Sequence, residues 1–510
     1  MQELLKSPTV IKQLREKGIS THSIAQQITF LHQAQPSITL LRPCTIKDGI
    51  SVIKENDTDP LLQQCTKAAK AGEIIKFVPA SGASSRMFNT LIKDYQSPTS
   101  ASNADLLVEQ FFSDLKKFAF YEDLFQALSH DHLSLEDMIK EKQFHDILEY
   151  VLTSKGLNYA NLSKGFIKFH RYFNDNRSAV EEHFHEAASV FLDQKRCARI
   201  HFTISQDSKT LFEEHIRQIS SKLSTRQLYF EITYSYQKPS TDTIALKMDD
   251  SPLLNNGGEL IFRPGGHGAL LENLSDLEGD FIYLKNIDNI ATDTLRETTS
   301  YYQKLLCGLL ITLQKKIFSY LERLSSDHPQ DLKMEDIFNF MRAKLFIDTP
   351  AHILASGYQD QKEYCIQRLN RPLRVCGMVK NESEPGGGPF WVKDPICGIS
   401  LQIVEQAEVN LSDPEQEAIW KNSTHFNPVD ICCAIRDFRG NKFNLSRFRD
   451  DSRIFIAIKS KDGQTIKALE LPGLWNGGMA YWNTVFIEIP VEIFNPVKTV
   501  FDLLRKEHQP

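Results

Sequence analysis

Ile74-Ile-Lys-Phe-Val-Pro-Ala-Ser-Gly-Ala-Ser-Ser-Arg-Met87 joins a short apolar run to a loop of small residues that ends in a cation. Such a run, stopped by Pro, Ser and Gly, is typical of a buried strand entering a tight loop. Small side chains let the backbone approach a ligand, successive N–H groups can bind an anion, and Arg86 is a bidentate donor for phosphate. The loop therefore predicts phosphate binding, although it is not a Walker A motif and an ordinary strand-to-helix turn is the alternative.

The chain beyond this loop alternates between helical and strand-like patterns. Helices are predicted over 180–192 and 211–223, and strands over 198–204, 228–234, 280–284, 373–378, 398–405, 430–435, 453–458 and 484–489. Alternation of this kind favours an α/β fold, with a mainly parallel mixed sheet flanked by helices.

Three sections are helical in pattern. Residues 1–70 resemble a helical N-terminal cap, with helices joined by a polar loop, and the remaining 71–510 form the α/β domain. Two helical insertions interrupt that domain at about 95–160 and 292–370.

Composition limits the class of protein. The 510 residues are 41% hydrophobic and 24% charged with a net charge of -6, which excludes a long disordered chain and argues against nucleic acid as a partner. The N-terminus lacks the apolar core of a secretory signal, and the longest apolar run, 305–313, is about half a membrane span. Nine cysteines without a CxxC pair indicate reduced thiols. We expect a soluble cytoplasmic protein with no membrane partner.

A second informative region pairs Phe262-Arg-Pro-Gly-Gly-His-Gly-Ala-Leu270 with Asp280-Phe-Ile-Tyr-Leu-Lys-Asn-Ile-Asp-Asn289. It combines a glycine-rich loop at a helix start with a strand whose carboxyl end carries Asp288. Ligands of open parallel sheets bind at that end of the strands. The glycines could also form a purely structural turn, and Asp288 could cap the segment that follows.

These motifs resemble those of the sugar-nucleotide pyrophosphorylases. The stretch Pro79–Met87 is similar to their LAAGxGTRM signature, with Gly82 and Arg86 on its Gly and Arg, while Ser81 and Ser84 depart from it. Over its whole length the chain is similar to an uncharacterised bacterial family of the domain-of-unknown-function type. The resemblance implies a GT-A/Rossmann-like nucleotidyltransferase fold.

The resemblance also implies which residues bind the nucleotide and a metal. Ile287-Asp288-Asn289 is similar to a VDN segment, so Asp288 would bind Mg²⁺, with Asn483 as a second metal ligand. The nucleotide-binding residues would be Ala80, Ser81, Gly82, Ala83, Ser84, Ser85, Gly265, Gly266, His267 and Gly268.

Three cations are the implied catalytic residues: Arg86, Lys164 and Lys498. Lys164 lies in a segment that resembles a PKxLxP motif, with Ser163 in place of its Pro, and Lys93 is the alternative by spacing. Lys498 lies in Phe494-Asn-Pro-Val-Lys-Thr-Val-Phe-Asp-Leu-Leu504, which resembles FLPVKTxxDLL.

Sugar binding is implied for three residues further along. Gly387 belongs to the turn Glu384-Pro-Gly-Gly-Gly-Pro389, and Glu405 to a segment similar to the family's IVE. An Asn on the sugar is either Asn427 or Asn422.

The histidine-rich segment Glu181-Glu-His-Phe-His-Glu186 invites comparison with a metal site. His183 and His185 are two residues apart and point to different helix faces, and HExxH is absent, so no metal is predicted there.

The function that the resemblance implies is transfer of a nucleotidyl group from a nucleoside triphosphate to a sugar-1-phosphate, with Mg²⁺ as cofactor and release of pyrophosphate. Two alternatives stay open: a glycosyltransferase that uses a finished nucleotide sugar, and an inactive nucleotide sensor whose helical sections bind a protein partner. The sequence does not fix the base, the sugar or the oligomeric state.

Overall fold

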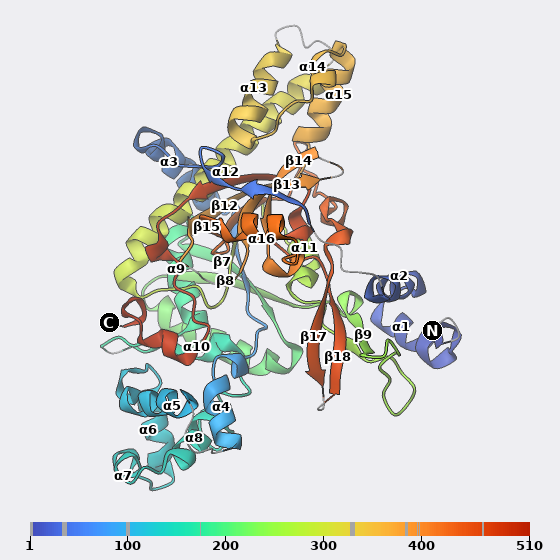
Figure 1. The fold of residues 1–510 in the computed structure, drawn as a ribbon. Helices are drawn as coiled ribbons and strands as arrows, with labels where there is room; N and C mark the ends of the chain where they lie inside the picture. Colours follow the sequence, from blue (N-terminus) through green and yellow to red (C-terminus); the bar gives the residue numbers. More distant parts are fainter. Residues whose placement is uncertain are drawn as a thin grey trace. The chain divides into compact units, whose positions relative to one another are not determined.

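A computed structural model describes residues 4–32, 38–97, 103–173, 175–326, 332–382, 386–394, 396, 398–461 and 464–509. The chain forms two compact units from interleaved stretches (Figure 1). Unit 1 takes Met1–Cys65, Tyr236–Tyr283 and Leu306–Ile489, and unit 2 takes Thr66–Ser235, Leu284–Leu305 and Pro490–Pro510.

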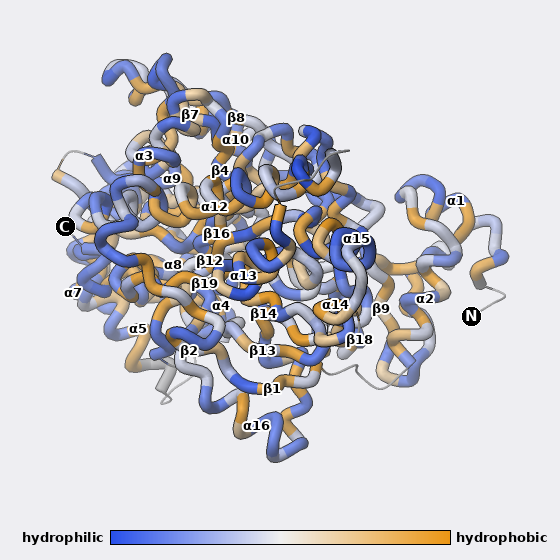
Figure 2. The backbone as a smooth tube through the Cα atoms, turned by 90° about the horizontal axis from the view of Figure 1, so that it is seen from above, coloured by the Kyte–Doolittle hydropathy of each residue, from blue (hydrophilic) through white to orange (hydrophobic). Residues whose placement is uncertain are grey.

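The core of unit 1 is a mixed sheet with β12 (Leu373–Lys380) at its centre. On one side β19 (Asn483–Glu488), β3 (Gly49–Ser51) and β2 (Thr45–Ile46) follow in parallel, and on the other side β16 (Asp430–Ala434) is antiparallel. Burial of β12 from Leu373 to Val379 is typical of a strand covered on both faces. Figure 2 shows these central strands as mainly hydrophobic. The predicted mixed α/β class is confirmed.

Two antiparallel sheets complete the strands of unit 1. One has the order β1 (Leu40–Pro43), β13 (Gly388–Asp394), β14 (Gly398–Val404); the short β15 (His425–Phe426) pairs with β12. The other has the order β10 (Phe262–Arg263), β9 (Thr243–Lys247), β18 (Gln464–Glu470), β17 (Phe455–Lys461).

The N-terminal helices of unit 1 pack on the second of these sheets. Val10 and Leu14 of α1 (Pro8–Lys17) and Ile24 of α2 (Thr21–His32) share one apolar cluster with residues of β9 and β18, and α2 lies beside β9 (Figure 1). Gly18 ends α1 with a φ of 70°, and its N–H donates to the carbonyls of Leu14 and Arg15. Where a polar loop was predicted within 1–70, the structure has the short strands β1, β2 and β3.

The predicted helical section 292–370 is confirmed. It contains α12 (Arg296–Ser325), which starts in unit 2 and continues into unit 1, followed by α13 (Met334–Leu345), α14 (Ala351–Leu354) and α15 (Tyr358–Leu369). The other α-helices with residues in unit 1 are α3 (Glu55–Ala71), α11 (Leu270–Asp276) and α16 (Pro414–Lys421). Among the helices of the described residues, none combines the length and the apolar character that crossing a bilayer demands.

Unit 2 is built around β4 (Ile74–Pro79), which pairs in parallel with β7 (Cys197–Ile204); β8 (Tyr229–Tyr236) follows at the edge. The helices α9 (Ala179–Val190) and α10 (Lys209–Ser224) and the small hairpin of β5 (Lys168–His170) and β6 (Arg177–Ser178) belong to the same unit. Every element that the alternating pattern predicted here is present.

The helical insertion predicted at 95–160 is also confirmed. It consists of α4 (Asn89–Gln96), α5 (Asn103–Ser113), α6 (Tyr121–His130), α7 (Leu135–Lys140) and α8 (Phe144–Leu152), which lie together in Figure 1. Its phenylalanines form the core of this subdomain: Phe118 stacks on Phe120 with ring centroids 5.0 Å apart, and Phe112 on Phe144 at 4.0 Å.

Candidate functional site

The small-residue loop of unit 2 leaves β4 at its carboxyl end and is braced by the segment that contains Lys164. Ser163 Oγ donates to the Ala80 carbonyl at 2.6 Å, and Ser84 donates to the Leu162 carbonyl through its N–H at 3.0 Å and its Oγ at 2.7 Å. The Lys164 N–H donates to the Gly82 carbonyl at 3.0 Å. Ser84 and Ser163, which depart from the family pattern, therefore fix the shape of this loop.

The tip of the loop is open. Ser81, Gly82 and Ala83 are exposed, and a Cβ added to Gly82 would meet nothing within 4 Å. Arg86, at the end of the turn Ser84–Arg86, is exposed too, and no side chain within the described ranges pairs with its guanidinium. The exposed backbone and the Arg86 side chain are thus accessible to an anion.

Asp288 is the centre of a cluster of charges just after β11 (Phe281–Lys285). Its Oδ2 lies 3.0 Å from Lys164 Nζ and 3.1 Å from Lys498 Nζ. Lys164 Nζ also donates to the Val497 carbonyl at 2.9 Å. The structure thus brings together Asp288, Lys164 and Lys498, which are far apart in the sequence. Lys93, the alternative to Lys164, lies exposed on α4.

The two ammonium groups set the ionisation of Asp288. Burial by itself would raise the pKa of this carboxyl group, but Lys498 and Lys164 outweigh it and hold the pKa below its usual value. Lys498 is half exposed at 51%, whereas Lys164 is only 12% exposed. The cluster has one anion and two cations, so it presents an excess of positive charge that suits a phosphate.

The segment after residue 490 positions Lys498. The Val497 N–H donates to the Asp288 carbonyl at 3.0 Å, and the Asn495 N–H donates to Asn289 Oδ1 at 3.0 Å. The Val500 N–H donates to the Met87 carbonyl at 3.0 Å, next to the small-residue loop. This segment therefore connects the Asp288 turn to the small-residue loop.

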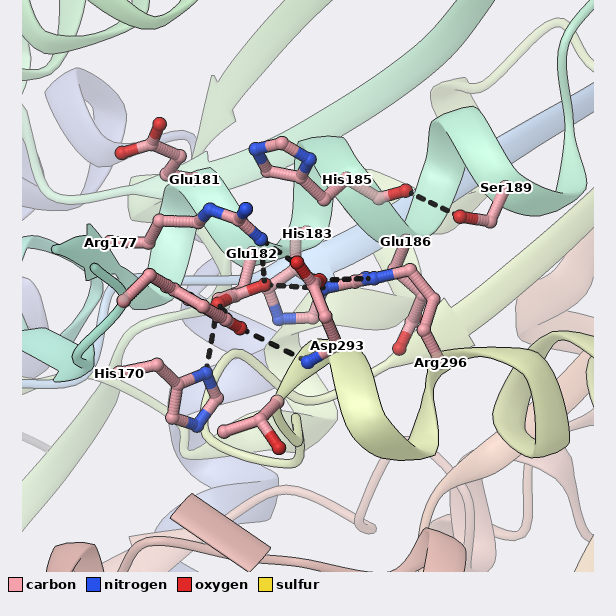
Figure 3. Close-up of polar contacts among 12 residues, drawn as sticks. His170, Arg177, Glu181, Glu182, His183, His185, Glu186, Ser189, Asp293 and Arg296 are labelled. Atoms are coloured by element: carbon pink, nitrogen blue, oxygen red, sulfur yellow. Dashed lines mark hydrogen bonds and ion pairs between the residues drawn. The ribbon is translucent and has the colours of Figure 1, made fainter. Parts of the chain in front are cut away.

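A buried network anchors the same segment through His508. His170 bonds to His508 Nδ1 at 2.8 Å through Nε2. Figure 3 shows the Glu182 end of this network, where His170 Nδ1 bonds to Glu182 Oε1 at 2.9 Å and Arg296 donates to Glu182 Oε2 at 2.6 Å. The cations and hydrogen bonds around Glu182 overcome the effect of burial and keep its pKa low, so it is an anion within the fold.

A second set of buried residues, from α9, β4 and β11, lies next to the Asp288 turn. His183 is fully buried, and its Nε2 lies 3.1 Å from the carbonyl oxygen of Ile287. Beside it, Glu186 bonds to Lys76 at 2.7 Å and to Lys285 at 2.8 Å. The segment of His183 and Glu186 stood out in the sequence, but these buried contacts were not predicted from it; the available signal was Lys76 within the apolar run of β4.

Acid is expected to destabilise unit 2 through histidines that burial keeps neutral. Burial lowers the pKa of His508 to about 3 and those of His185 and His215 to about 4, and it holds the pKa of His183 well below its usual value. Below about pH 6.5 the unfolded chain binds these protons and the folded chain does not, so the free energy of unfolding falls as the pH falls. Each such histidine contributes a loss of about 2 kcal/mol between pH 7 and pH 5.

Urea denaturation at pH 7 and pH 5 measures this loss. We expect His508→Asn to reduce the pH dependence, because the pKa of His508, about 3, lies further below the usual value than those of His185 and His215. An equal pH dependence in wild type and His508→Asn would contradict the assignment.

The histidine-rich helix α9 also contributes to a group of possible metal ligands, Asp175, Glu181 and His185, whose ligand atoms lie within 4.8 Å of one another. Lys222 Nζ bonds to Asp175 and lies 2.6 Å from Glu181 Oε1, and Arg177 Nε lies 3.3 Å from Asp175. These cations already neutralise the carboxylates.

In unit 1 the glycine-rich loop 265–268 packs closely on the backbone that follows β18. A Cβ on Gly268 would lie 2.1 Å from the Pro472 carbonyl oxygen, one on Gly265 would lie 2.6 Å from that of Thr241, and Gly266 has a φ of 75°. His267 stacks on Trp475, with centroids 4.3 Å apart, and its Nε2 lies 3.6 Å from Glu405. Packing on neighbouring backbone and side chains therefore accounts for these glycines, and His267 is held against Trp475.

The predicted sugar-binding residues lie near one another in unit 1. The Asn427 N–H donates to the Gly387 carbonyl at 2.8 Å, and a Cβ on Gly387 would lie 3.4 Å from Glu405 Cγ. Asn427 Nδ2 is buried without a partner in the described chain, whereas Asn422 is exposed at the end of α16. The geometry favours Asn427 of the two. Glu384 and Pro385 of the same turn lie outside the described residues.

Asn483 was predicted as a second metal ligand. It begins β19, and its Nδ2 donates to the Leu369 carbonyl at 3.3 Å within unit 1. Asp288 belongs to unit 2.

Comparison with known proteins gives a family and several solved structures. A family model described as "Domain of unknown function (DUF4301)" matches residues 7–509. A search of curated proteins finds no match.

Similar solved structures include two pyrophosphorylases. A mutant UDP-glucose pyrophosphorylase from Leishmania major in complex with UDP-glucose is 12% identical, with 98% of this chain and 78% of that chain covered and a TM-score of 0.45. The uridine diphosphate N-acetylglucosamine pyrophosphorylase from Trypanosoma brucei in complex with inhibitor is 12% identical, with 96% and 74% covered and a TM-score of 0.45.

Proposed function

This chain belongs to the DUF4301 family, and since that family's description assigns no activity, we propose one from the residues themselves. The protein is a sugar-1-phosphate nucleotidyltransferase. A phosphate oxygen of the sugar-1-phosphate attacks the α-phosphorus of a nucleoside triphosphate, a new P–O bond forms, and the bond from the α-phosphorus to the bridging oxygen breaks and releases pyrophosphate.

The observation that carries this proposal is the cluster of Asp288, Lys164 and Lys498. Both reactants are anions, so the barrier is lowered mainly by positioning and by neutralisation of charge. Two lysines fixed around one carboxylate supply cations whose positions are set before the substrate binds. The family resemblance of the loop, of Asp288 and of Lys498 supports the same reaction.

Each group then has a role. The exposed backbone of residues 81–83 and the Arg86 guanidinium bind the β- and γ-phosphates. Lys164, held by the Val497 carbonyl, and Lys498 neutralise charge on the transferring phosphate. No general base is needed, because the attacking phosphate oxygen is already ionised at neutral pH.

The Asp288 carboxylate also fits Mg²⁺. It stays ionised, and its two ion pairs use Oδ2, while Oδ1 accepts no hydrogen bond from any described residue. Magnesium in proteins takes one or two carboxylates and completes its octahedron with substrate phosphates and water. Asp288 would hold the ion, which when bound would add positive charge at the α-phosphate.

Thermal-shift titration with ATP, CTP, GTP, UTP and dTTP, with and without Mg²⁺, tests nucleotide binding. A ligand at 100 times its Kd stabilises a fold by about 2.7 kcal/mol, so one triphosphate is expected to raise the melting temperature. We expect Arg86→Gln to abolish this shift because it removes the bidentate phosphate donor. Lys93→Gln, which removes an exposed charge from the neighbouring α4, is the matched control and is expected to keep it.

A screen of sugar-1-phosphates for pyrophosphate release follows with the triphosphate that binds. Binding without turnover on any sugar phosphate would favour the nucleotide sensor, and sugar transfer without pyrophosphate would favour the glycosyltransferase. No shift with any triphosphate would refute the proposed function.

A further inference from the structure

The helix α9 carries His183, a residue of the histidine-rich segment to which the proposed function gives no role. His183 is fully buried, and its Nε2 lies 3.1 Å from the carbonyl oxygen of Ile287, the residue before Asp288. A carbonyl oxygen only accepts hydrogen bonds, so Nε2 carries a proton and donates it. Burial, together with the neighbouring Lys76, holds the pKa of His183 well below its usual value, so Nδ1 is unprotonated.

The position of His183 is itself fixed by the ion pairs of Glu186. The two residues lie three positions apart on α9, so they share one face of the helix (Figure 3). Glu186 bonds to Lys76 of β4 at 2.7 Å and to Lys285 of β11 at 2.8 Å. Lys76 Nζ also donates to the backbone carbonyl of His183 at 3.2 Å. These contacts attach α9 to both strands, and the imidazole therefore has a rigid support.

The Ile287 carbonyl depends on His183 for its hydrogen bond. Ile287 is 6% exposed, and within the described ranges no backbone N–H donates to its carbonyl. The next carbonyl, that of Asp288, accepts from the Val497 N–H at 3.0 Å. The peptide groups on both sides of the Asp288 Cα are thus held, each by a different element. The direction in which the Asp288 side chain leaves the backbone is therefore fixed.

We propose that His183 is a positioning residue for Asp288, an inference that rests on the proposed function. By holding the Ile287 carbonyl, His183 keeps the Asp288 carboxylate beside Lys164 and Lys498 in the geometry that the reaction needs. A displacement of about 1 Å in such a site can cost about 10²-fold in rate. A fully buried donor that never touches the substrate can therefore control turnover.

Two substitutions separate this hydrogen bond from the packing of the ring. His183→Leu removes the donor and keeps a buried side chain, whereas the side-chain amide of His183→Gln can still donate to the Ile287 carbonyl. We expect His183→Leu to lower kcat for pyrophosphate release by about tenfold or more and to leave the KM of the triphosphate within about twofold of wild type. His183→Gln is expected to restore most of the lost kcat.

His185→Leu is the matched control, because it makes the same change two residues along α9. His185 lies with Asp175 and Glu181 and not beside the Asp288 turn, so we expect the kcat and KM of wild type. The proposal fails if the kcat of His183→Leu matches that of wild type. It also fails if His183→Gln loses as much kcat as His183→Leu, since packing of the ring would then explain both losses.

A measurement on the wild-type protein tests the hydrogen bond even if His183→Leu does not fold. Ring-nitrogen NMR of protein with isotopically labelled histidine distinguishes the two neutral forms of an imidazole. We expect the signal that is lost in His183→Gln to come from a ring with its proton on Nε2. A proton on Nδ1 would mean that the bond to Ile287 is not formed, and the proposal would be wrong.

Failure of this inference is distinct from failure of the proposed function. If wild type releases no pyrophosphate with any sugar phosphate, the function is refuted, and the positioning role of His183 with it. If wild type turns over and His183→Leu turns over equally fast, only the positioning role is refuted. Melting temperatures, with turnover measured well below them, exclude unfolding as the cause of a lower kcat.

Discussion

Replacing Glu186 by Gln is expected to lower the free energy of unfolding of unit 2 by about 3–5 kcal/mol, because it removes the buried carboxylate to which two buried ammonium groups bond. Lys76 and Lys285 are 0% and 1% exposed, and both bond to this carboxylate. Burial already lowers the pKa of Lys76 to about 8, even with Glu186 in place. Urea denaturation followed by circular dichroism at pH 7 measures the change.

Lys76→Met is the matched control for this prediction. It removes one of the two cations and leaves one positive and one negative charge, on Lys285 and Glu186. The unbranched Met side chain fills much of the space of the lysine. We expect it to cost far less than Glu186→Gln, and buried ion pairs replaced by apolar groups have even gained stability. If Lys76→Met lowered the free energy of unfolding more than Glu186→Gln does, the prediction would be wrong. Glu186 would then not stabilise the fold by neutralising buried positive charge.

Asp288→Asn is expected to lower the rate of pyrophosphate release by about 10²- to 10³-fold, the usual cost of one preorganised electrostatic contact. The amide keeps the size of the carboxylate but no longer forms ion pairs with Lys164 and Lys498 and, under the proposed function, no longer offers Mg²⁺ a charged ligand. Because both lysines remain, we expect binding of the triphosphate without Mg²⁺ to persist, so the loss falls on kcat. Single-turnover kinetics together with the thermal-shift titration measure the two effects separately.

Asp280→Asn tests whether the loss is specific to the site. Asp280 precedes the same strand, β11, at its other end and is half exposed, so the change removes one carboxylate of the same chemistry. We expect wild-type turnover from this variant. Turnover of Asp288→Asn within a few-fold of wild type would remove Asp288 from the mechanism.

Strands such as β4 and β12 were predicted from continuous apolar runs, since burial on both faces leaves such a pattern. Two of the missed strands, β13 and β18, lack that pattern. Residues 388–394 begin with Gly and Pro, which are typical of a turn, and residues 464–470 mix polar and apolar side chains. Pairing with β14 and β9 stabilises them, and such non-local contacts leave no local signal.

The site was predicted in part. Residue types and family motifs indicated the loop, Asp288, Lys498 and Lys164, while the spacing after Arg86 kept Lys93 as the alternative to Lys164. The contact between Lys164 and Asp288 joins residues 124 positions apart, and no local pattern records it. The buried ion pairs of Glu186 with Lys76 and Lys285 were also not predicted, because Glu186 and Lys285 look like ordinary surface residues in the sequence.

The order of the stretches along the chain affects how the protein folds during synthesis. Lys498 and His508 leave the ribosome only after the whole 306–489 stretch of unit 1. The interior of unit 2 and the cluster of Asp288, Lys164 and Lys498 can therefore form only late in synthesis. They depend on contacts between residues far apart in the sequence, and such contacts slow folding. A nascent chain stalled before residue 490 would contain the small-residue loop but not Lys498, so under the proposed function nucleotide binding would report whether the stretch after 490 has joined unit 2.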